Sequence, residues 1–259
     1  MEKGVEEVIF VSPFDGLTQS YLIKKPQGSI CYCIAICLHG ATNHQHQGMD
    51  RNIFNGTFGY IQDYFQKNNY VYVCPEYRGD SWMNNAAEAD ILYLINRLKS
   101  EFKTGNVILM GGSMGGTSTL IFSTRHPDIV SGVLAMCPAT DMEKLYYQWI
   151  FNNQKHLAYG IEIAYGGTPE HKKIEYAKRS SIKHIKKLKN KPVAIIHGNS
   201  DNLISVEHSR SFVKKAEKTG IKIFYQEIEH GDHDSPVKQF SFIEKALLWL
   251  EKGISFCAD

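Results

Sequence analysis

The stretch over residues 106–120 constrains the fold of this chain more than any other. Residues 107–110 are a short apolar run typical of a buried strand, and residues 111–116 then place four glycines around Ser113 and Met114. The apolar residues that follow favour a helix. A serine on so sharp a turn has a strained backbone and needs small neighbours, because larger side chains would clash. The sequence therefore predicts a strand over residues 107–110, a very tight turn that carries Ser113, and a helix over residues 117–125.

This turn carries a Gly-x-Ser-x-Gly pattern, formed by Gly111, Ser113 and Gly115. The turn lifts the serine hydroxyl clear of the sheet, and the positive end of the following helix points to where an oxyanion would form. The pattern predicts Ser113 as a catalytic nucleophile. A phosphate-binding turn is the alternative. Neither Gly-x-Gly-x-x-Gly nor Gly-Lys-Ser/Thr occurs at this turn, so dinucleotide and P-loop sites are not expected.

The remaining chain alternates strand-like and helix-like segments, which predicts a mostly parallel sheet with helices on both faces. Residues 30–38 are almost wholly apolar, as in a strand buried on both sides. Strands are expected over residues 5–11, 20–24, 30–38, 70–74, 107–110, 131–137, 192–196 and 221–228, and helices over residues 54–69, 85–102, 117–125, 205–219 and 236–251.

Length and composition agree with one α/β domain over residues 1–259. A net charge of +2 gives no reason to expect nucleic acid or an anionic membrane as a partner. No apolar segment approaches the length of a membrane span, and the charged N-terminus lacks the apolar stretch of a signal peptide. Most of the six cysteines read as small buried thiols, so we expect a cytoplasmic protein. Oligomeric state is not predicted.

One region breaks the alternation. Residues 139–190 show no convincing strand but many aromatic side chains, and a structureless loop of this length would be uncommon. We therefore expect a helical insertion within the domain. Because it follows a strand, it would lie over the site side of the sheet as a cap, with Tyr147 and Trp149 lining the substrate pocket. The alternative is that these aromatic side chains are ordinary core.

An acid and a base follow the serine in chain order. Asp201 comes just after an apolar strand, and His233 lies between the last strand and the last helix. The serine needs His233 to take its proton, and the imidazole needs Asp201 to hold its tautomer and stabilise its cation. His230 in the same loop competes for the role of base. Asp232 and Asp234 compete weakly for the role of acid.

Two amide donors would complete the site as an oxyanion hole. Met114 supplies one, and Ala41 or Thr42, after the apolar strand that ends at Leu38, supplies the other. A metal site is the alternative use of this loop, with ligands from His39, His44, His46 and Asp50. No zinc-type motif and no Cys-x-x-Cys pair occurs, so no metal and no cofactor is expected.

Taken together, these motifs resemble an α/β-hydrolase and, more narrowly, the catalytic domain of the prolyl oligopeptidase family. The matching pieces follow the order of that family: His39-Gly40, Tyr77-Arg78-Gly79, residues 111–116, residues 179–182, residues 197–201 and Gly231-Asp232-His233. By this resemblance Ser113, Asp201 and His233 take the triad roles. Small stand-alone members of the fold are commonly carboxylesterases.

The function expected first is a serine carboxylesterase that cleaves small or medium acyl esters through an acyl-enzyme. The alternatives are an oligopeptidase or aminopeptidase-like amidase acting on short peptides, and a non-catalytic binding protein with a hydrolase fold. The complete set of Ser113, Asp201 and His233 argues against the last, since a binding module needs none of the three groups together.

Overall fold

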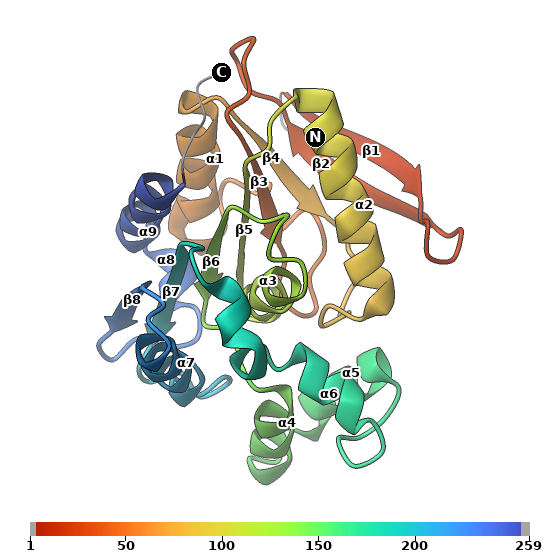
Figure 1. Cartoon of the computed structure of the whole chain (residues 1–259), viewed down its shortest axis with the longest axis vertical. Coiled ribbons are helices and arrows are strands. Elements are labelled where there is room, and N and C mark those ends of the chain that lie inside the picture. The colour runs from red at the N-terminus through yellow and green to blue at the C-terminus, as the bar shows by residue number, and fades with distance from the viewer. Residues whose placement is uncertain (1–3, 255–259) are drawn as a thin grey trace.

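A single mixed sheet runs through the protein (Figure 1). The computed structural model describes residues 4–254; residues 1–3, part of the charged N-terminus, and residues 255–259, which include Cys257, lie outside it. Within the described chain the strand order is β1-β2-β4-β3-β5-β6-β7-β8. The strands are β1 (Val5–Val11), β2 (Thr18–Lys24), β3 (Cys33–Leu38), β4 (Tyr70–Pro75), β5 (Val107–Gly112), β6 (Gly132–Met136), β7 (Val193–Gly198) and β8 (Ile223–Ile228).

Strand β2 is antiparallel to both β1 and β4, and every pairing from β4 to β8 is parallel. The central strands are buried on both faces, as the apolar run that ends at Leu38 predicts. Ile34 and Ile36 point into one core, whereas Cys33 and Ala35 point into the other. The alternation of a six-residue strand thus divides its side chains between two hydrophobic layers.

Helices cover both faces of this sheet (Figure 1). The α2 and α3 side chains pack into the core of Ile34, whereas the α1 and α9 side chains pack into the core of Cys33. The helices are η1 (Phe54–Gly56), α1 (Thr57–Lys67), α2 (Asn85–Phe102), α3 (Met114–Arg125), α4 (Met142–Phe151), α5 (Lys155–Tyr165), α6 (Lys173–Arg179), η2 (Ser181–Leu188), α7 (Glu207–Lys218), α8 (Ser235–Lys238) and α9 (Phe240–Gly253). The architecture is the one predicted: a mostly parallel sheet between two helical layers.

Some element boundaries differ from the prediction for local reasons. The helix expected from residue 117 begins at Met114, directly after the serine. The closing helix is interrupted at Gln239, whose ψ of 85° is not helical, so that α9 starts at Phe240. The ring of Phe240 stacks on Tyr60 of α1 with centroids 5.4 Å apart. These shifts leave the order of the elements unchanged.

The segment between β6 and β7 holds α4, α5, α6 and η2, and this wholly described stretch contains no strand. Figure 1 shows α4, α5 and α6 gathered at one end of the molecule. Arg179 ties the segment to the domain. Its buried guanidinium donates to the Met83 carbonyl (2.8 Å) and to Asn85 Oδ1 (2.7 Å), and it lies over the ring of Tyr165.

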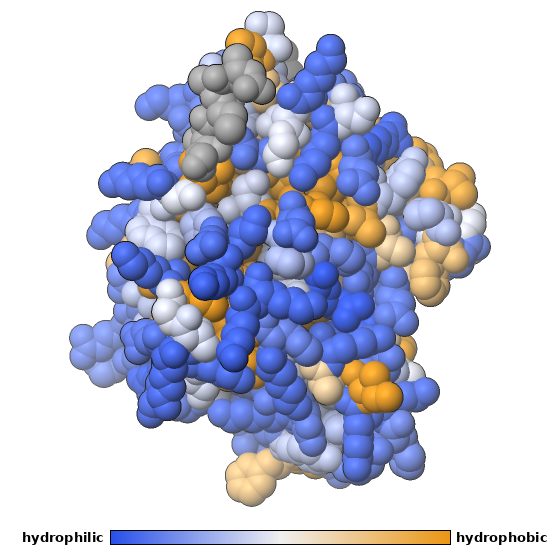
Figure 2. Space-filling model, viewed as in Figure 1, coloured by the Kyte–Doolittle hydropathy of each residue, from blue (hydrophilic) through white to orange (hydrophobic). Residues whose placement is uncertain are grey.

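The molecular surface in Figure 2 is largely hydrophilic, with apolar side chains gathered where the β1–β2 hairpin projects. The exposed apolar residues of this hairpin are Ile9, Val11, Phe14 and Leu17. Over residues 4–254 we find no helix whose length and apolar character would suit a membrane crossing.

Candidate active site

Ser113 lies between the end of β5 and the start of α3, in a backbone conformation that side chains seldom adopt. Its φ is 58° and its ψ is −121°. The turn closes so tightly that a Cβ on Gly111 would lie 2.6 Å from the carbonyl carbon of Gly115, and a Cβ on Gly115 would collide with the Leu38 carbonyl. Both glycines are therefore required sterically. Strain of this kind persists only where the surrounding structure enforces it, and it concentrates at functional sites.

Asp201 lies in the turn after β7, with its carboxylate wholly buried. Its Oδ1 atom accepts the backbone N–H groups of Leu203 (2.8 Å) and Ile204 (2.9 Å). Burial raises the pKa of this carboxyl. The hydrogen bonds from His197 and His233 together lower that pKa by more than burial raises it, so the net pKa is well below the usual value. Asp201 is thus a fixed buried anion.

His233 lies in the loop between β8 and α8. Its Nδ1 atom is 2.7 Å from Asp201 Oδ2. Because the carboxylate only accepts, Nδ1 carries the proton and Nε2 is left to act as a base. His233 and Ser113 line the same cavity. Within the described chain no hydrogen bond joins their side chains; such bonds are often long in free enzymes and tighten around a substrate.

The other candidates for the base and the acid, His230, Asp232 and Asp234, do not take part in the contact between His233 and Asp201. His230 takes a left-handed φ of 55°, and its side chain is 88% exposed against 15% for His233. Asp232 accepts hydrogen bonds from the Ser235 amide and hydroxyl, and Asp234 pairs with Lys238 at 3.1 Å. The structure therefore brings Asp201 and His233 together and leaves the alternatives outside this pair.

Two residues close to Ser113 have backbone amides that could donate to an oxyanion: Met114 follows it in the chain, and Ala41 lines the same cavity. Met114 is the first residue of α3, where a helix amide has no intrahelical acceptor. In the loop after β3, the Thr42 N–H donates to Asp80 Oδ1 at 2.6 Å and the Gly40 N–H donates to Gln47 Oε1 at 2.8 Å. Among the described residues nothing accepts the Ala41 N–H, and Ala41 lines the cavity beside Ser113. Of the two loop amides named from the sequence, the one at Ala41 is free.

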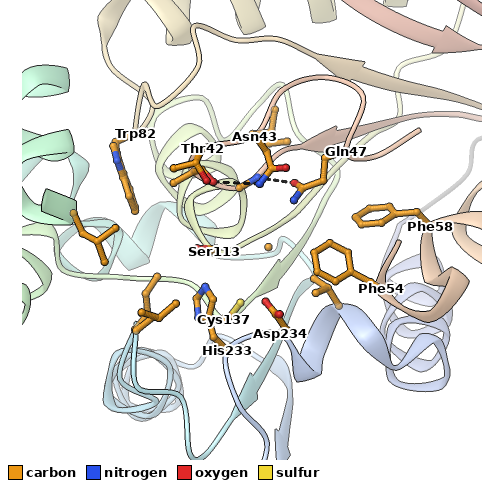
Figure 3. Close-up of a pocket in the computed structure, with 18 of the residues that line it drawn as sticks. Thr42, Asn43, Gln47, Phe54, Phe58, Trp82, Ser113, Cys137, His233 and Asp234 are labelled. Carbon is orange, nitrogen blue, oxygen red and sulfur yellow. Dashed lines mark hydrogen bonds between the residues drawn. The ribbon is translucent and has the colours of Figure 1, made fainter. Parts of the chain in front are cut away.

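The cavity at the serine has a volume of about 240 Å³. Figure 3 shows Ser113 between Trp82 on one side and Phe54 and Phe58 on the other. Its lining residues are Leu38, Gly40, Ala41, Thr42, Asn43, Gln47, Phe54, Phe58, Trp82, Gly112, Ser113, Cys137, Trp149, Leu157, Leu203, Ile204, His233, Asp234 and Val237.

The two aromatic residues that the sequence predicts as cap residues of the pocket, Tyr147 and Trp149, differ in position. Trp149 lines the cavity, packs edge-on against Trp82 with centroids 5.6 Å apart, and donates its Nε1–H to the Leu203 carbonyl at 2.7 Å. Tyr147 is not among the lining residues. Its half-exposed side chain instead donates its hydroxyl to Glu170. Residues two positions apart in an α-helix point about 200° apart, so Tyr147 and Trp149 lie on opposite faces of α4.

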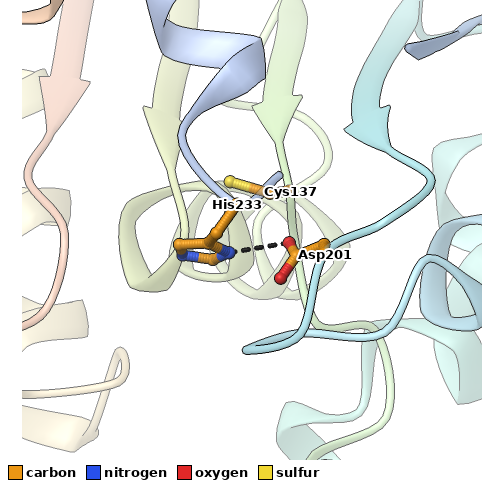
Figure 4. Close-up of side chains that lie close together, drawn as sticks. All are labelled: Cys137, Asp201 and His233. Carbon is orange, nitrogen blue, oxygen red and sulfur yellow. Dashed lines mark hydrogen bonds and ion pairs between the residues drawn. The ribbon is translucent and has the colours of Figure 1, made fainter. Parts of the chain in front are cut away.

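The histidines after β3 do not form a metal site in the described part of the chain. His39 is buried, with Nδ1 2.8 Å from the Gly40 carbonyl and Nε2 2.9 Å from the Glu76 carbonyl. The described residues do bring one set of metal-ligand types together, Cys137, Asp201 and His233, with ligand atoms within 4.8 Å of one another (Figure 4).

This set does not fit a metal ion well. Asp201 and His233 already hydrogen-bond each other. Burial and then the Asp201 charge raise the pKa of the Cys137 thiol well above its usual value. Only the thiolate is a strong metal ligand.

One residue of the site was missed in the sequence. His197, at the end of β7, is fully buried and lies 3.2 Å through Nε2 from Asp201 Oδ2. The only available signal was its position four residues before the predicted acid, in the segment that resembles the family.

The fold and this site define a class: a serine hydrolase with the α/β-hydrolase fold. The family model of the prolyl oligopeptidase family matches residues 57–255, which is most of the chain. The chain therefore belongs to the prolyl oligopeptidase family. No curated protein sequence matches it.

Solved structures agree in fold. An acylaminoacyl peptidase from Pyrococcus horikoshii is 15% identical at a TM-score of 0.74, covering 99% of this chain and 43% of its own. FphF, a fluorophosphonate-binding serine hydrolase from Staphylococcus aureus, is 16% identical at a TM-score of 0.71. The match covers 95% of this chain and 97% of FphF. A thermostable esterase is 18% identical at a TM-score of 0.67, and the match covers 96% of this chain and 63% of the esterase. The chain thus spans less than half of the peptidase but nearly all of FphF.

Proposed function

We propose that the protein is a carboxylesterase that cleaves small or medium acyl esters, with Ser113 as nucleophile, His233 as base and Asp201 as the acid of the triad. The observation that carries the proposal is that a strained serine shares an apolar cavity with a histidine bound to a buried carboxylate. Residues 139–190 act as a cap over this cavity.

In this mechanism His233 Nε2 takes the Ser113 proton as the hydroxyl attacks the ester carbonyl. The oxyanion that forms accepts hydrogen bonds from the amides of Met114 and Ala41. His233, now a cation held by Asp201, returns the proton to the leaving alcohol, and the acyl group remains on Ser113. A water activated by His233 then releases the acid by the same steps in reverse.

An ester is preferred to a peptide because of what lines the cavity. The described lining has one carboxylate, Asp234, and it pairs with Lys238 at 3.1 Å, so no free acid is present to hold a peptide amino terminus. The peptidase relative keeps the alternative open: an oligopeptidase or aminopeptidase-like amidase acting on short peptides. An amide would place a greater demand on His233, since the amine is a poor leaving group.

The test is a comparison of p-nitrophenyl acyl esters with aminoacyl p-nitroanilides, together with labelling by a fluorophosphonate. We expect hydrolysis of the esters, labelling at Ser113, and loss of both in a folded Ser113→Ala variant. Loss of the nucleophile should lower kcat by on the order of a millionfold. A protein that the reagent does not label would be the non-catalytic binding protein, and preferential cleavage of anilides would make it an amidase.

A further inference from the structure

The cavity has two apolar walls that lie on opposite sides of Ser113 (Figure 3). We call them the cap wall and the α1 wall. The cap wall consists of Trp149 and Leu157 from residues 139–190, together with Trp82, Leu203 and Ile204 from outside that segment. The α1 wall consists of Phe54, Phe58 and Val237, from η1, α1 and α8. No residue of the α1 wall comes from the cap segment, residues 139–190.

We propose that the α1 wall is a second substrate lobe, which binds the alcohol half of the ester while the cap wall binds the acyl half. The substrate class is then a neutral ester with apolar groups on both sides of the scissile bond. This inference rests on the proposed function and adds the substrate's second half to it.

The geometry of acyl transfer requires space on both sides of the serine. The carbonyl carbon must approach Ser113 Oγ while its oxygen points to the amides of Met114 and Ala41. The acyl and alkoxy groups leave a planar carbonyl carbon in divergent directions, so they cannot both lie against one wall. Binding energy from both halves then helps to orient the reacting bond.

The α1 wall is built rigidly. Phe54, Asn55 and Gly56 take three successive left-handed φ values of 49°, 60° and 77°. Two of these are strained non-glycine residues, and such strain indicates a segment held in place for function. The ring of Phe54 lies 5.8 Å from that of Phe58. The stacked rings of Tyr60 and Phe240 join α1 to the start of α9.

The α1 wall also touches the serine turn. A Cβ placed on Gly112, the residue before Ser113, would lie 2.9 Å from Val237 Cγ1. Val237 follows the His233 loop in α8, so the same short segment supplies the base and part of the wall. A group held on this wall therefore lies next to the reacting atoms.

The charges favour a neutral ligand. None of the described lining residues is a lysine or an arginine, and Asp234 is already paired with Lys238. Gln47 uses its Oε1 atom to accept the Gly40 amide. A charged substituent would lose its water without gaining a partner, which is unfavourable.

The experiment measures acid release from two ester series, so that neither half needs a chromophore. One series varies the alcohol from ethyl to hexyl acetate, and the other varies the acyl group from ethyl acetate to ethyl hexanoate. Phe54→Ala removes part of the α1 wall, and the matched Leu157→Ala removes an aliphatic side chain from the cap wall. Thermal unfolding and the rate of fluorophosphonate labelling report whether each variant is folded and competent.

We expect Phe54→Ala to change the hexyl-to-ethyl ratio of kcat/KM in the alcohol series by about tenfold and to leave the acyl series nearly unchanged. Leu157→Ala should do the reverse. If Phe54→Ala does not fold, Phe54→Trp, which narrows the lobe, should reduce cleavage of the longer alcohols selectively. Equal effects of both variants on both series, or effects with the two series exchanged, would overturn the assignment.

Failure of the proposed function would look different. A wild-type protein that cleaves anilides and not esters would reject the esterase assignment. The same variants would then be compared on amides with varied acyl and amine halves, and only a separation between the halves would support the two lobes.

Discussion

His197 Nε2 lies 3.2 Å from Asp201 Oδ2, the same oxygen that accepts the Nδ1–H of His233. The same Nε2 atom is 2.9 Å from the Ile204 carbonyl. A carbonyl only accepts, so Nε2 carries a proton and donates. On the other side of the ring, Nδ1 is 2.7 Å from the Ser209 hydroxyl. The buried His197 ring therefore connects Ser209 of α7 to the Asp201 carboxylate, which in turn hydrogen-bonds His233.

From this contact we predict that His197 is a positioning residue. His197→Leu should lower kcat by about tenfold to a hundredfold with little change in KM, because the Asp201 carboxylate loses one of its restraints and small displacements of catalytic groups are costly. His197→Gln, whose amide N–H can replace Nε2–H, should recover much of the loss. Ser209→Ala removes the other partner of the ring and serves as the matched control.

A purely structural role would give a different pattern. In that case Leu and Gln variants would lose activity in proportion to their loss of unfolding free energy, with no difference between esters of good and poor leaving groups. A positioning role predicts a larger loss with alkyl esters than with p-nitrophenyl esters, because only the former depend strongly on proton donation by His233.

The assignment of the base predicts unequal effects at the two loop histidines. His233→Ala should lower kcat by on the order of a millionfold, comparable to removal of the serine. His230→Ala should leave kcat nearly unchanged and alter the unfolding free energy by about 0.5 kcal/mol or less, since its side chain is exposed. Steady-state kinetics on folded variants checks this. Equal losses would leave His233 without a special role, and a greater loss at His230 would make that residue the base.

The sequence predicts those parts of the site that depend on local pattern. The Gly-rich turn identifies Ser113, because a strand, a helix and four glycines can join only through a tight elbow. The apolar runs that end before Asp201 and His233 identify the strand ends, which meet at one edge of a parallel sheet. The fold class follows from the same alternation and is confirmed by the sheet and by its structural relatives.

Other features depend on contacts between distant segments, and no local pattern indicates them. The Thr42 amide is taken by Asp80, 38 residues away. Phe54 reaches the cavity through a left-handed backbone at Asn55 that its sequence does not require. Tyr147 and Trp149 look equivalent in sequence, but their partners, Glu170 and the Leu203 carbonyl, come from different parts of the chain.

Stability should depend on pH through His208, a buried histidine of α7. Its Nδ1 atom is 3.3 Å from the Thr140 amide nitrogen, and Nε2 has no hydrogen-bond partner among the described residues. Burial lowers the pKa of His208 to about 3 from 6.5. The folded protein therefore holds it neutral, while the unfolded chain binds a proton below pH 6.5. Its contribution is fully present above that pH and is lost as the pH falls toward 3.

This linkage has a measurable size. Between pH 7 and pH 5 the wild-type unfolding free energy should fall by about 2 kcal/mol more than that of His208→Asn, whose side-chain oxygen can accept in place of Nδ1 without titrating. Urea unfolding at the two pH values checks the difference. The same pH dependence in both proteins would contradict the prediction.

The last prediction concerns Trp149, which links the proposed cap to the loop that carries Asp201. Its Nε1–H donates to the Leu203 carbonyl, and the Leu203 amide donates to Asp201 Oδ1. Trp149→Phe keeps an aromatic ring against Trp82 but removes this donor. We expect a lower kcat across all acyl lengths, by about tenfold, because the acid loop loses a restraint. Tyr147→Phe, two positions earlier in α4, removes a hydroxyl that donates to Glu170; it is the matched control and should keep wild-type kcat. Kinetics over an acyl series distinguishes the outcomes. If Trp149→Phe changes only the preference for acyl length, Trp149 acts as a wall of the pocket and does not position Asp201. If both variants behave like the wild type, the proposed cap is not coupled to the triad through this contact.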